Sequence, residues 1–295
     1  MNRARALVVA ARLRTLPAAA SPVIVGLAIA WAAGQFRVLP AVATMLFSLL
    51  IQVGTNYTND VLDFERGTDT ADRVGPLRVT QAGLLTPRAV KLAAAGAFGA
   101  AALIAVYLAF VGGWPVVAIG VVSIACGVAY TGGPWPLAHH GLADLFVMAF
   151  FGFVAVCGTV FIQLGHIPPL AWACSLPIGA LATAILVVNN TRDLATDRIA
   201  GRRTVPVVLG RRAGVVEYAA LLAAAYATPA AIVAAGLAGP WTLLTLVTLP
   251  WGVGLARTLA RTEGPALNAT LAGTAKLLLV FALLLAAGLV VPGRP

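Results

Sequence analysis

The stretch from Ala41 to Asp63 reads AVATMLFSLLIQVGTNYTNDVLD. It begins as an apolar run of the kind that crosses the ~30 Å hydrocarbon core of a bilayer, and it ends in a cluster of amide and carboxylate side chains. On a helix, Asn56, Asp60 and Asp63 follow one another at i, i+4 and i+7, so they lie on one face. The stretch therefore predicts a transmembrane helix with a polar face at one end.

Apolar runs of similar length recur along the rest of the chain. The 295 residues are 60% hydrophobic and only 10% charged, whereas a soluble domain carries about a quarter charged residues. These runs, with the Gly and Pro residues between them, predict nine spans. The spans cover residues 16–34, 40–60, 90–111, 114–131, 143–163, 170–190, 215–237, 240–256 and 268–291. Since backbone polar groups in lipid must pair within their own segment, we expect a single all-α transmembrane domain over residues 1–295.

The positive charges are distributed unevenly between the two ends of these spans. Seventeen of the twenty Lys and Arg residues lie before the first span, in loops after even-numbered spans or, for Lys91, at the adjoining end of the next span. The opposite side has only Arg37 and Arg294, and Lys276 lies within the last span. This bias predicts a cytoplasmic N-terminus and an outside C-terminus, with residues 1–15 as a basic interfacial segment. It also accounts for the net charge of +10 without a nucleic-acid partner.

Seven of the ten acidic residues occupy two short segments in or next to the predicted cytoplasmic loops 61–89 and 191–214. The second segment repeats the pattern of the first, with Asn189, Asp193 and Asp197 at i, i+4 and i+8. The first Asn and the first Asp of the two patterns are each 133 positions apart (189 − 56 and 193 − 60). This spacing indicates an internal repeat that brings the two acidic faces together across a central cavity. Carboxylates at such spacings repel one another, so we expect a cation between them.

Short oxygen-bearing side chains suit Mg²⁺, which takes few carboxylates and completes its shell with water and phosphate oxygens. The predicted Mg²⁺ ligands are Asn56, Asp60, Asp63, Asn189, Asp193 and Asp197. Arginines follow each acidic segment, and their planar donors suit phosphate oxygens. We assign Arg78, Arg202 and Arg192 to a diphosphate. A metal-bridged diphosphate beside a hydrophobic cavity indicates a lipid diphosphate substrate, whereas the purely structural alternative is two acidic helix ends paired with nearby arginines.

The motifs also resemble those of a known family. Asn59-Asp60-x-x-Asp63 and Asp193-x-x-x-Asp197 stand on the second and sixth of nine predicted spans. This arrangement resembles the UbiA superfamily of intramembrane aromatic prenyltransferases, and the resemblance covers the whole chain. It implies a UbiA-type bundle of nine helices around a central cavity.

The first motif departs from the widespread family pattern in one respect. Gly67 stands where the family usually has a third Asp, and Asp69 follows two positions later. With Arg78 further on, this variant is similar to the menaquinone branch of the family. A second departure is Arg202, where the family often has Lys; the positive charge is retained, so we expect diphosphate binding to be retained.

The resemblance implies a reaction and a location. A polyprenyl diphosphate, bound with Mg²⁺, would transfer its polyprenyl group to 1,4-dihydroxy-2-naphthoate with loss of CO₂, giving demethylmenaquinone. The catalytic residues would be Asp60, Asp63, Asp193 and Asp197. For the acceptor we predict contacts from Tyr130 and Asp144, which flank a cytoplasmic loop, and from Asn59. The enzyme would be a multi-pass protein of the cell (inner) membrane, in contact with membrane lipid, with its active site facing the cytoplasm.

Two other functions remain open at this point. A prenyltransferase of the same fold with another aromatic or a sugar-phosphate acceptor would carry similar motifs. A cation-coupled transporter would also use intramembrane acids and an internal repeat, but it predicts charges near the bilayer midplane and broken helices there. The acids in this chain lie at helix ends instead. The prenyl chain length and the oligomeric state do not follow from these patterns.

Overall fold

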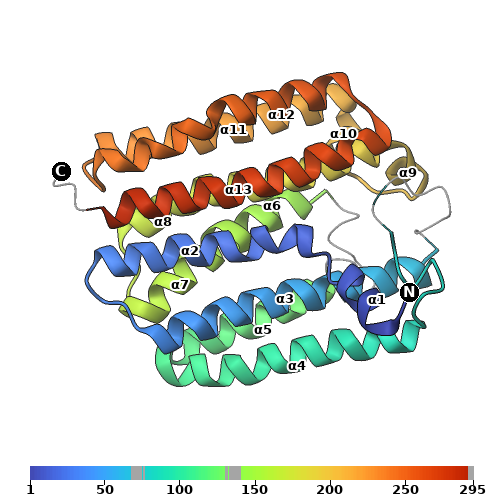
Figure 1. Ribbon diagram of the computed structural model, residues 1–295, viewed down its shortest axis with the longest axis horizontal. Coiled ribbons are helices and arrows are strands. Elements are labelled where there is room, and N and C mark those ends of the chain that lie inside the picture. The colour runs from blue at the N-terminus through green and yellow to red at the C-terminus, as the bar shows by residue number, and fades with distance from the viewer. Residues whose placement is uncertain (68–74, 76, 130–131, 133–140, 292–295) are drawn as a thin grey trace.

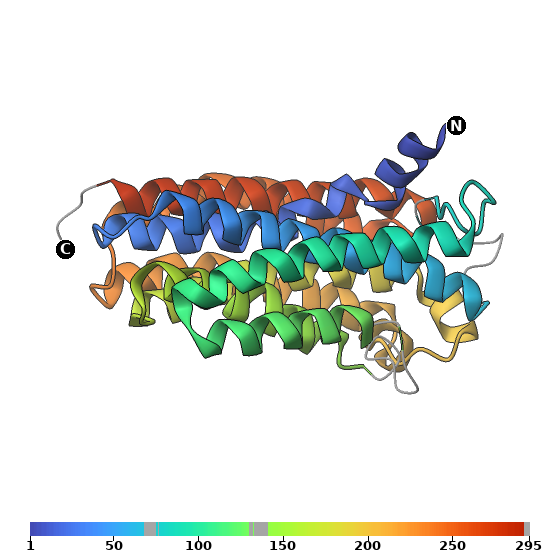
Figure 2. The same ribbon diagram turned by 90° about the horizontal axis from the view of Figure 1, so that it is seen from below.

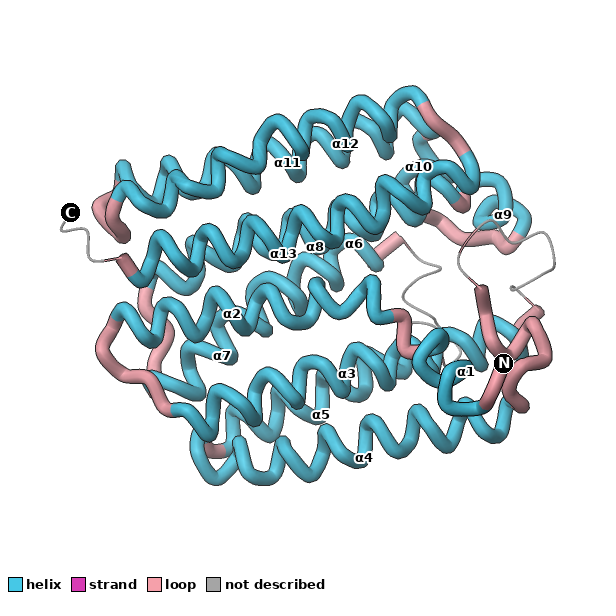
Figure 3. Tube along the Cα trace, in the orientation of Figure 1, coloured by secondary structure: helices cyan, strands magenta, loops and turns pink. Residues whose placement is uncertain are grey.

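The computed structural model describes residues 1–67, 75, 77–129, 132 and 141–291. The regular structure of these residues is entirely helical, and the long helices pack side by side as a bundle (Figures 1 and 3). This confirms the all-α fold class that the apolar runs predicted.

The described elements follow one another along the chain as α-helices, with three 3₁₀ segments (η1, η4, η5) and one π-helical segment (η3). Their bounds are α1 Arg3–Ala10, η1 Leu13–Thr15, α2 Leu16–Ala32, α3 Val38–Glu65, α4 Pro87–Gly112, α5 Trp114–Ala129, α6 Ala143–Val147, η3 Met148–Val154, α7 Ala155–Leu164, α8 Pro169–Arg192, α9 Leu194–Ile199, α10 Val205–Leu209, α11 Arg211–Ala234, η4 Pro240–Thr248, α12 Leu249–Arg261, η5 Gly264–Ala266 and α13 Leu267–Val290.

Eight stretches of the described residues are long and apolar enough to cross a membrane. Within the same residues, each of the predicted spans overlaps helical structure, although two are composite. The span predicted at 143–163 consists of α6, η3 and α7, and that at 240–256 consists of η4 and α12. The span predicted at 114–131 corresponds to α5, which at 16 residues is shorter than the others. The chain is thus a multi-span membrane protein, while the number of crossings stays a prediction.

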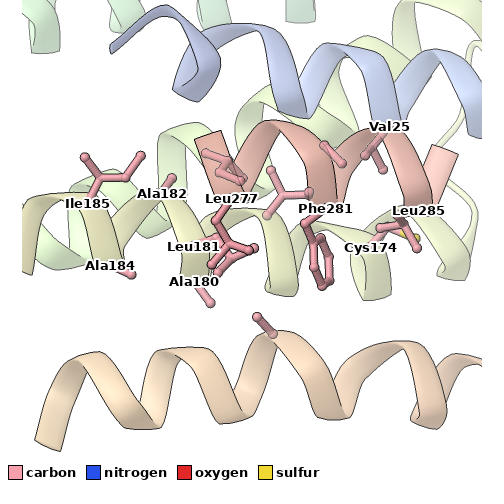
Figure 4. Close-up of a cluster of buried hydrophobic side chains, with 14 of the residues drawn as sticks. Val25, Cys174, Ala180, Leu181, Ala182, Ala184, Ile185, Leu277, Phe281 and Leu285 are labelled. Atoms are coloured by element: carbon pink, nitrogen blue, oxygen red, sulfur yellow. The ribbon is translucent and has the colours of Figure 1, made fainter. Parts of the chain in front are cut away.

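Helix α8 lies at the centre of the bundle, with 72% of its most apolar window buried. Small residues let its neighbours approach closely, because they keep side-chain atoms out of the helix contact. A Cβ atom added at Gly152 of η3 would lie 2.8 Å from the Cα atom of Gly179 on α8. On the other side of α8, Leu181 belongs to the same buried cluster as Leu277 and Phe281 of α13 (Figure 4). The bundle is therefore held by apolar packing around one central helix.

A second apolar cluster packs the N-terminal segment against the end of α3. Ala6 and Ala10 of α1 are buried with Val61 of α3 and with Val79 and Leu85 of the loop that follows it. Seen from below, α1 diverges from the long helices at one end of the bundle (Figure 2). One face of the predicted interfacial segment thus packs on protein. Its contact with a membrane surface stays a prediction.

The ends of the elements locate the candidate site. α1, α9 and α10 lie at one end of the bundle, whereas the C-terminal end of α13 lies at the other (Figure 1). The acidic ends of α3 and α8 precede the loops at the same end as α1 and α9. The two acidic segments therefore reach the same end of the molecule, as the repeat spacing predicted.

Candidate active site

A cavity of about 790 Å³ opens between the helices, next to the acidic segments. Most of its wall is apolar and comes from α2, α3, α5 and the helices from α6 to α8, with Phe146, Phe150 and Phe151 among the lining residues. The polar side chains that line it include Asp63, Arg78, Asn189, Arg192, Asp193 and Arg202. The cavity therefore joins a charged region to a long hydrophobic space, which suits a ligand with an anionic head and an apolar tail.

Asp63 is the meeting point of the charged region. It lies in the last turns of α3 and is buried. Its Oδ2 atom accepts a hydrogen bond from Nη2 of Arg78 at 2.7 Å, and its Oδ1 atom accepts one from Nη2 of Arg202 at 3.3 Å. Two cations thus bind one carboxylate, which offsets the cost of burying it.

Arg202 links the two acidic segments. Its Nη1 atom donates to Oδ1 of Asp197 on α9 at 3.4 Å, while its Nη2 atom donates to Asp63 on α3. Asp63 and Asp197 belong to different halves of the chain, so this guanidinium shows that the two predicted segments meet in space.

Arg192 makes a separate buried network at the end of α8. Its Nε and Nη2 atoms donate to the two carboxylate oxygens of Asp193 at 2.8 and 2.6 Å. Nη2 also donates to Oδ1 of Asn189, and Nη1 donates to Oδ1 of Asn268 on α13, both at 2.8 Å. The side chain of Arg192 is fully buried. It thus ties two predicted metal ligands to the last helix of the bundle.

Asp60 holds the loop that follows α3. Its Oδ1 atom accepts hydrogen bonds from the hydroxyl of Thr80 at 2.6 Å and from its backbone N–H at 3.0 Å, and Oδ2 accepts from the N–H of Val79 at 3.2 Å. These bonds anchor the turn directly after Arg78 and so direct this arginine towards Asp63. Asp60 itself is fully buried and does not line the cavity.

Asn56 contacts the N-terminal segment. Its Nδ2 atom donates to the carbonyl oxygen of Ala11 at 2.9 Å and to Oγ1 of Thr15 at 3.0 Å. Gln52, one turn earlier on α3, donates to the same Thr15 hydroxyl at 3.2 Å. The first acidic segment therefore holds two pieces of chain in place, the turn before α2 and the turn after Arg78.

Of the three predicted acceptor residues, the two that the structure describes do not line the cavity. Tyr130 lies outside the described residues. Asp144 is half-buried in the first turn of α6, and Asn59 is half-buried on α3, but neither lines the cavity. Ala143, the neighbour of Asp144, does line it. An acceptor role for these three residues stays a prediction.

Sequence reasoning missed Gln52, Thr80 and Asn268. Gln52 stands at i−4 from Asn56 and extends its polar face, so the helical period could have found it. Thr80 and Asn268 carry no such signal. Each is recruited by a partner from another element, Asp60 and Arg192 respectively.

The oxygen atoms of the site fit a divalent cation. Among the described residues no three His, Cys, Asp or Glu side chains already form a metal-binding cluster. However, the guanidinium of Arg202, which only donates hydrogen bonds, lies between carboxylate oxygens from both segments. A positive charge is thus stable at this point. The surrounding donors are the hard oxygens that Mg²⁺ prefers, and they leave positions for water and phosphate.

Comparisons with known proteins agree with this geometry. Residues 19–284 match the model of the UbiA prenyltransferase family. The chain is 33% identical over 282 residues to the 1,4-dihydroxy-2-naphthoate octaprenyltransferase of Bacillus subtilis (strain 168), covering 95% of this chain and 90% of that protein. It is 39% identical over 243 residues to the protein of the same name from Mycobacterium tuberculosis (strain ATCC 25618 / H37Rv), covering 81% of each.

A solved structure shares the fold. The UbiA homolog from Archaeoglobus fulgidus bound to DMAPP and Mg²⁺ matches with a TM-score of 0.63 and 14% identity, over 93% of this chain and 98% of that one. The family model covers most of the chain, and the B. subtilis relative matches 95% of it. This chain belongs to the UbiA prenyltransferase family.

Proposed function

We propose that this protein transfers a polyprenyl group from a polyprenyl diphosphate to 1,4-dihydroxy-2-naphthoate, with release of diphosphate, CO₂ and a proton, giving the quinol form of demethylmenaquinone. The observation that carries the proposal is the meeting of both acidic segments, through Asp63, Arg202 and Asp197, at the charged end of an apolar cavity of about 790 Å³. The names of the relatives from B. subtilis and M. tuberculosis support the naphthoate acceptor.

The arginines of the site are the proposed diphosphate ligands. Arg78, Arg192 and Arg202 line the cavity and now donate to carboxylates. Phosphate oxygens accept the same planar pairs of hydrogen bonds. A diphosphate entering the cavity would therefore take over these donors, and the carboxylates they release would become available to cations.

The carboxylates and amides of the two segments are the proposed Mg²⁺ ligands. Asp63, Asn189 and Asp193 line the cavity, and Asp197 adjoins it through Arg202. Bound Mg²⁺ would neutralise the diphosphate and make it a better leaving group. Asn56 and Asp60, the other predicted ligands, hold backbone turns in this structure (Ala11 to Thr15 and Val79 to Thr80), so they would reach an ion only by releasing those turns.

The apolar wall of the cavity has a chemical role of its own. The allylic carbon that loses diphosphate becomes electron-poor, and water would capture it. Phe146, Phe150 and Leu108 are among the side chains that line the space beyond the charged end. They exclude water from the carbon that is to be attacked, so that the electron-rich acceptor ring is the nucleophile that reaches it.

The assay that tests this function uses purified protein, an isotopically labelled polyprenyl diphosphate and a panel of aromatic acids. We expect 1,4-dihydroxy-2-naphthoate to give a labelled product whose mass equals acceptor plus prenyl group minus CO₂ and one hydrogen, or minus two further hydrogens once air has oxidised the quinol to the quinone. Acids that lack the two hydroxyl groups of the naphthoate ring should react at least about tenfold more slowly, since a site built for a polar contact rejects a ligand without it. Prenylation of another acceptor in preference to the naphthoate would contradict the proposal.

We further propose that the protein lies in the cell (inner) membrane as one domain over residues 1–295. Its N-terminus and active site would face the cytoplasm, and its C-terminus would lie outside. The charge bias of seventeen cationic residues against two supports this orientation. The loops at 61–89 and 191–214 would then both be cytoplasmic active-site loops.

The orientation can be tested by labelling single cysteines with a membrane-impermeant reagent in a variant without Cys126, Cys157 and Cys174. Cysteines at positions 200 and 262 should react only after the cells are permeabilised, because the reagent must reach the cytoplasmic side. Cysteines at positions 166 and 238 should react in intact cells. Reaction of position 200 in intact cells would contradict the proposed orientation.

A further inference from the structure

The arginines that line the cavity fall into two groups. In the described part of the chain they are Arg12, Arg14, Arg78, Arg192 and Arg202. The last three are paired with motif carboxylates, as described above. Arg14 differs, because it is exposed to the cavity and forms no ion pair with a described carboxylate. Arg12 and Arg14 are thus left over once the diphosphate ligands are assigned, and of these two residues Arg12 is half-buried whereas Arg14 is exposed.

A tight turn presents Arg14 to the cavity. Among the described residues, Arg12 is the only one other than glycine with a positive φ, at 52°. This left-handed conformation costs an L-residue about 1–2 kcal/mol, and here it separates α1 from η1. The carbonyl oxygen of Arg12 accepts hydrogen bonds from the backbone N–H and the hydroxyl of Thr15, at 2.8 and 2.9 Å. Arg14 therefore lies in a closed turn rather than in a loose terminal segment.

Helix α3 holds this turn in register with the acidic motif. Asn56 donates to both of its ends, Ala11 and Thr15, and Gln52 donates to Thr15. Asn56 precedes Asp63 by seven residues, which is about 10 Å along a helix. Asn56, which anchors the turn, therefore lies further into the bundle than Asp63. The separation along the helix is roughly the length of a fused aromatic ring system.

We infer that Arg14 binds the carboxylate of the aromatic acceptor; this inference rests on the proposed function. An acceptor acid must enter a site that already holds a diphosphate and several carboxylates, and the three paired arginines and Mg²⁺ would be taken up in balancing those negative charges. A guanidinium set apart from that cluster attracts the acid, and its planar fork matches a carboxylate with two hydrogen bonds. The ring is then held between the guanidinium and the reacting prenyl group.

The test compares Arg14→Gln with the matched control Arg5→Gln. Both variants remove one cation from the N-terminal segment, but Arg5 is exposed on α1 and does not line the cavity. Two competitive inhibitors act as probes: 1-hydroxy-2-naphthoate, which has the carboxylate, and 1-naphthol, which lacks it. The readouts are the two inhibition constants and the KM values for 1,4-dihydroxy-2-naphthoate and for the polyprenyl diphosphate.

In Arg14→Gln, we expect the KM for 1,4-dihydroxy-2-naphthoate and the inhibition constant of 1-hydroxy-2-naphthoate to rise about tenfold or more, since a hydrogen bond between charged groups is lost. The inhibition constant of 1-naphthol and the KM for the diphosphate should stay within about twofold. Arg5→Gln should change none of the four values. Arg14→Lys, which keeps the charge but not the fork, should lie between wild type and Arg14→Gln.

Equal changes for the two inhibitors, or a raised KM for the diphosphate alone, would overturn this assignment and make Arg14 a general interfacial cation or a diphosphate ligand. If Arg14→Gln does not fold, the comparison of the two inhibitors in Arg14→Lys decides. A wild-type protein that fails to prenylate the naphthoate defeats the proposed function. A wild type that succeeds, with an unchanged Arg14→Gln variant, defeats only this inference.

Discussion

The variant Asp63→Asn is expected to lose about a thousandfold or more in kcat/KM with every acceptor. The amide keeps the shape of the carboxylate but not its charge, so it can neither neutralise a metal–diphosphate complex nor balance Arg78 and Arg202 at 2.7 and 3.3 Å. Loss of about 4 kcal/mol of transition-state stabilisation corresponds to a thousandfold in rate. Because diphosphate departure does not involve the acceptor ring, the loss should be about equal for good and poor acceptors.

The matched control is Glu65→Gln on the same helix. Glu65 lies two residues after Asp63 and pairs at 2.7 Å with Lys91, and both side chains are partly exposed to solvent. Neutralising an exposed pair has little effect on stability, and this residue does not line the cavity. Its kcat/KM should therefore stay within about twofold of wild type. An Asp63→Asn protein that is folded by gel filtration and retains a tenth or more of wild-type activity would count against the two-segment site.

Chelation of divalent cations by EDTA is expected to reduce turnover to the background rate, and added Mg²⁺ should restore it in full. The reason is that the carboxylates of the site are paired with arginines. Without metal, the carboxylates of Asp63, Asp193 and Asp197 are balanced by arginines, so Mg²⁺ alone must compete with guanidinium groups. A diphosphate removes that competition, since it offers the arginines new acceptors and also supplies oxygens to the metal.

This reasoning makes a second measurement informative. Calorimetric titration should show weak Mg²⁺ binding to the protein alone and at least about tenfold tighter binding when a non-hydrolysable prenyl diphosphate analogue is present. By the reciprocity of linked binding, Mg²⁺ should tighten binding of the analogue by the same factor. The Glu65→Gln variant should behave as wild type in both titrations. Full turnover in excess EDTA, or equal Mg²⁺ affinity with and without the analogue, would contradict the proposed metal site.

The prediction of the helices succeeded because its causes are local. An apolar run of about 20 residues has few structures open to it in lipid, and each predicted span overlaps a helix within the described residues. The sequence did not show that some spans are built from more than one helical segment. The run at 143–163 contains the π-helical η3, whose Gly152 meets Gly179 of α8. That interruption occurs where two helices make close contact, and hydropathy carries no information about such a contact.

The convergence of the two acidic segments was predictable from the sequence as well. The spacing of Asn56, Asp60 and Asp63 placed three side chains on one face of a helix, and the repeat predicted that a second such face lies nearby. The pairing of Asp63 and Asp197 through Arg202 agrees with that expectation. Spacing did not reveal that Asp60 would anchor the turn at Thr80.

The sequence alone thus determined the helical bundle, the family and the end of the bundle at which the two acidic segments meet, because hydrophobic run length, charge distribution and helical period act over short stretches of chain. The tertiary structure alone decided which carboxylate each arginine binds, that Arg192 reaches Asn268 on the last helix, and that the turn at Arg12 brings Arg14 to the cavity. Such contacts join residues far apart in the chain, and their geometry depends on how the helices pack, which no local pattern specifies.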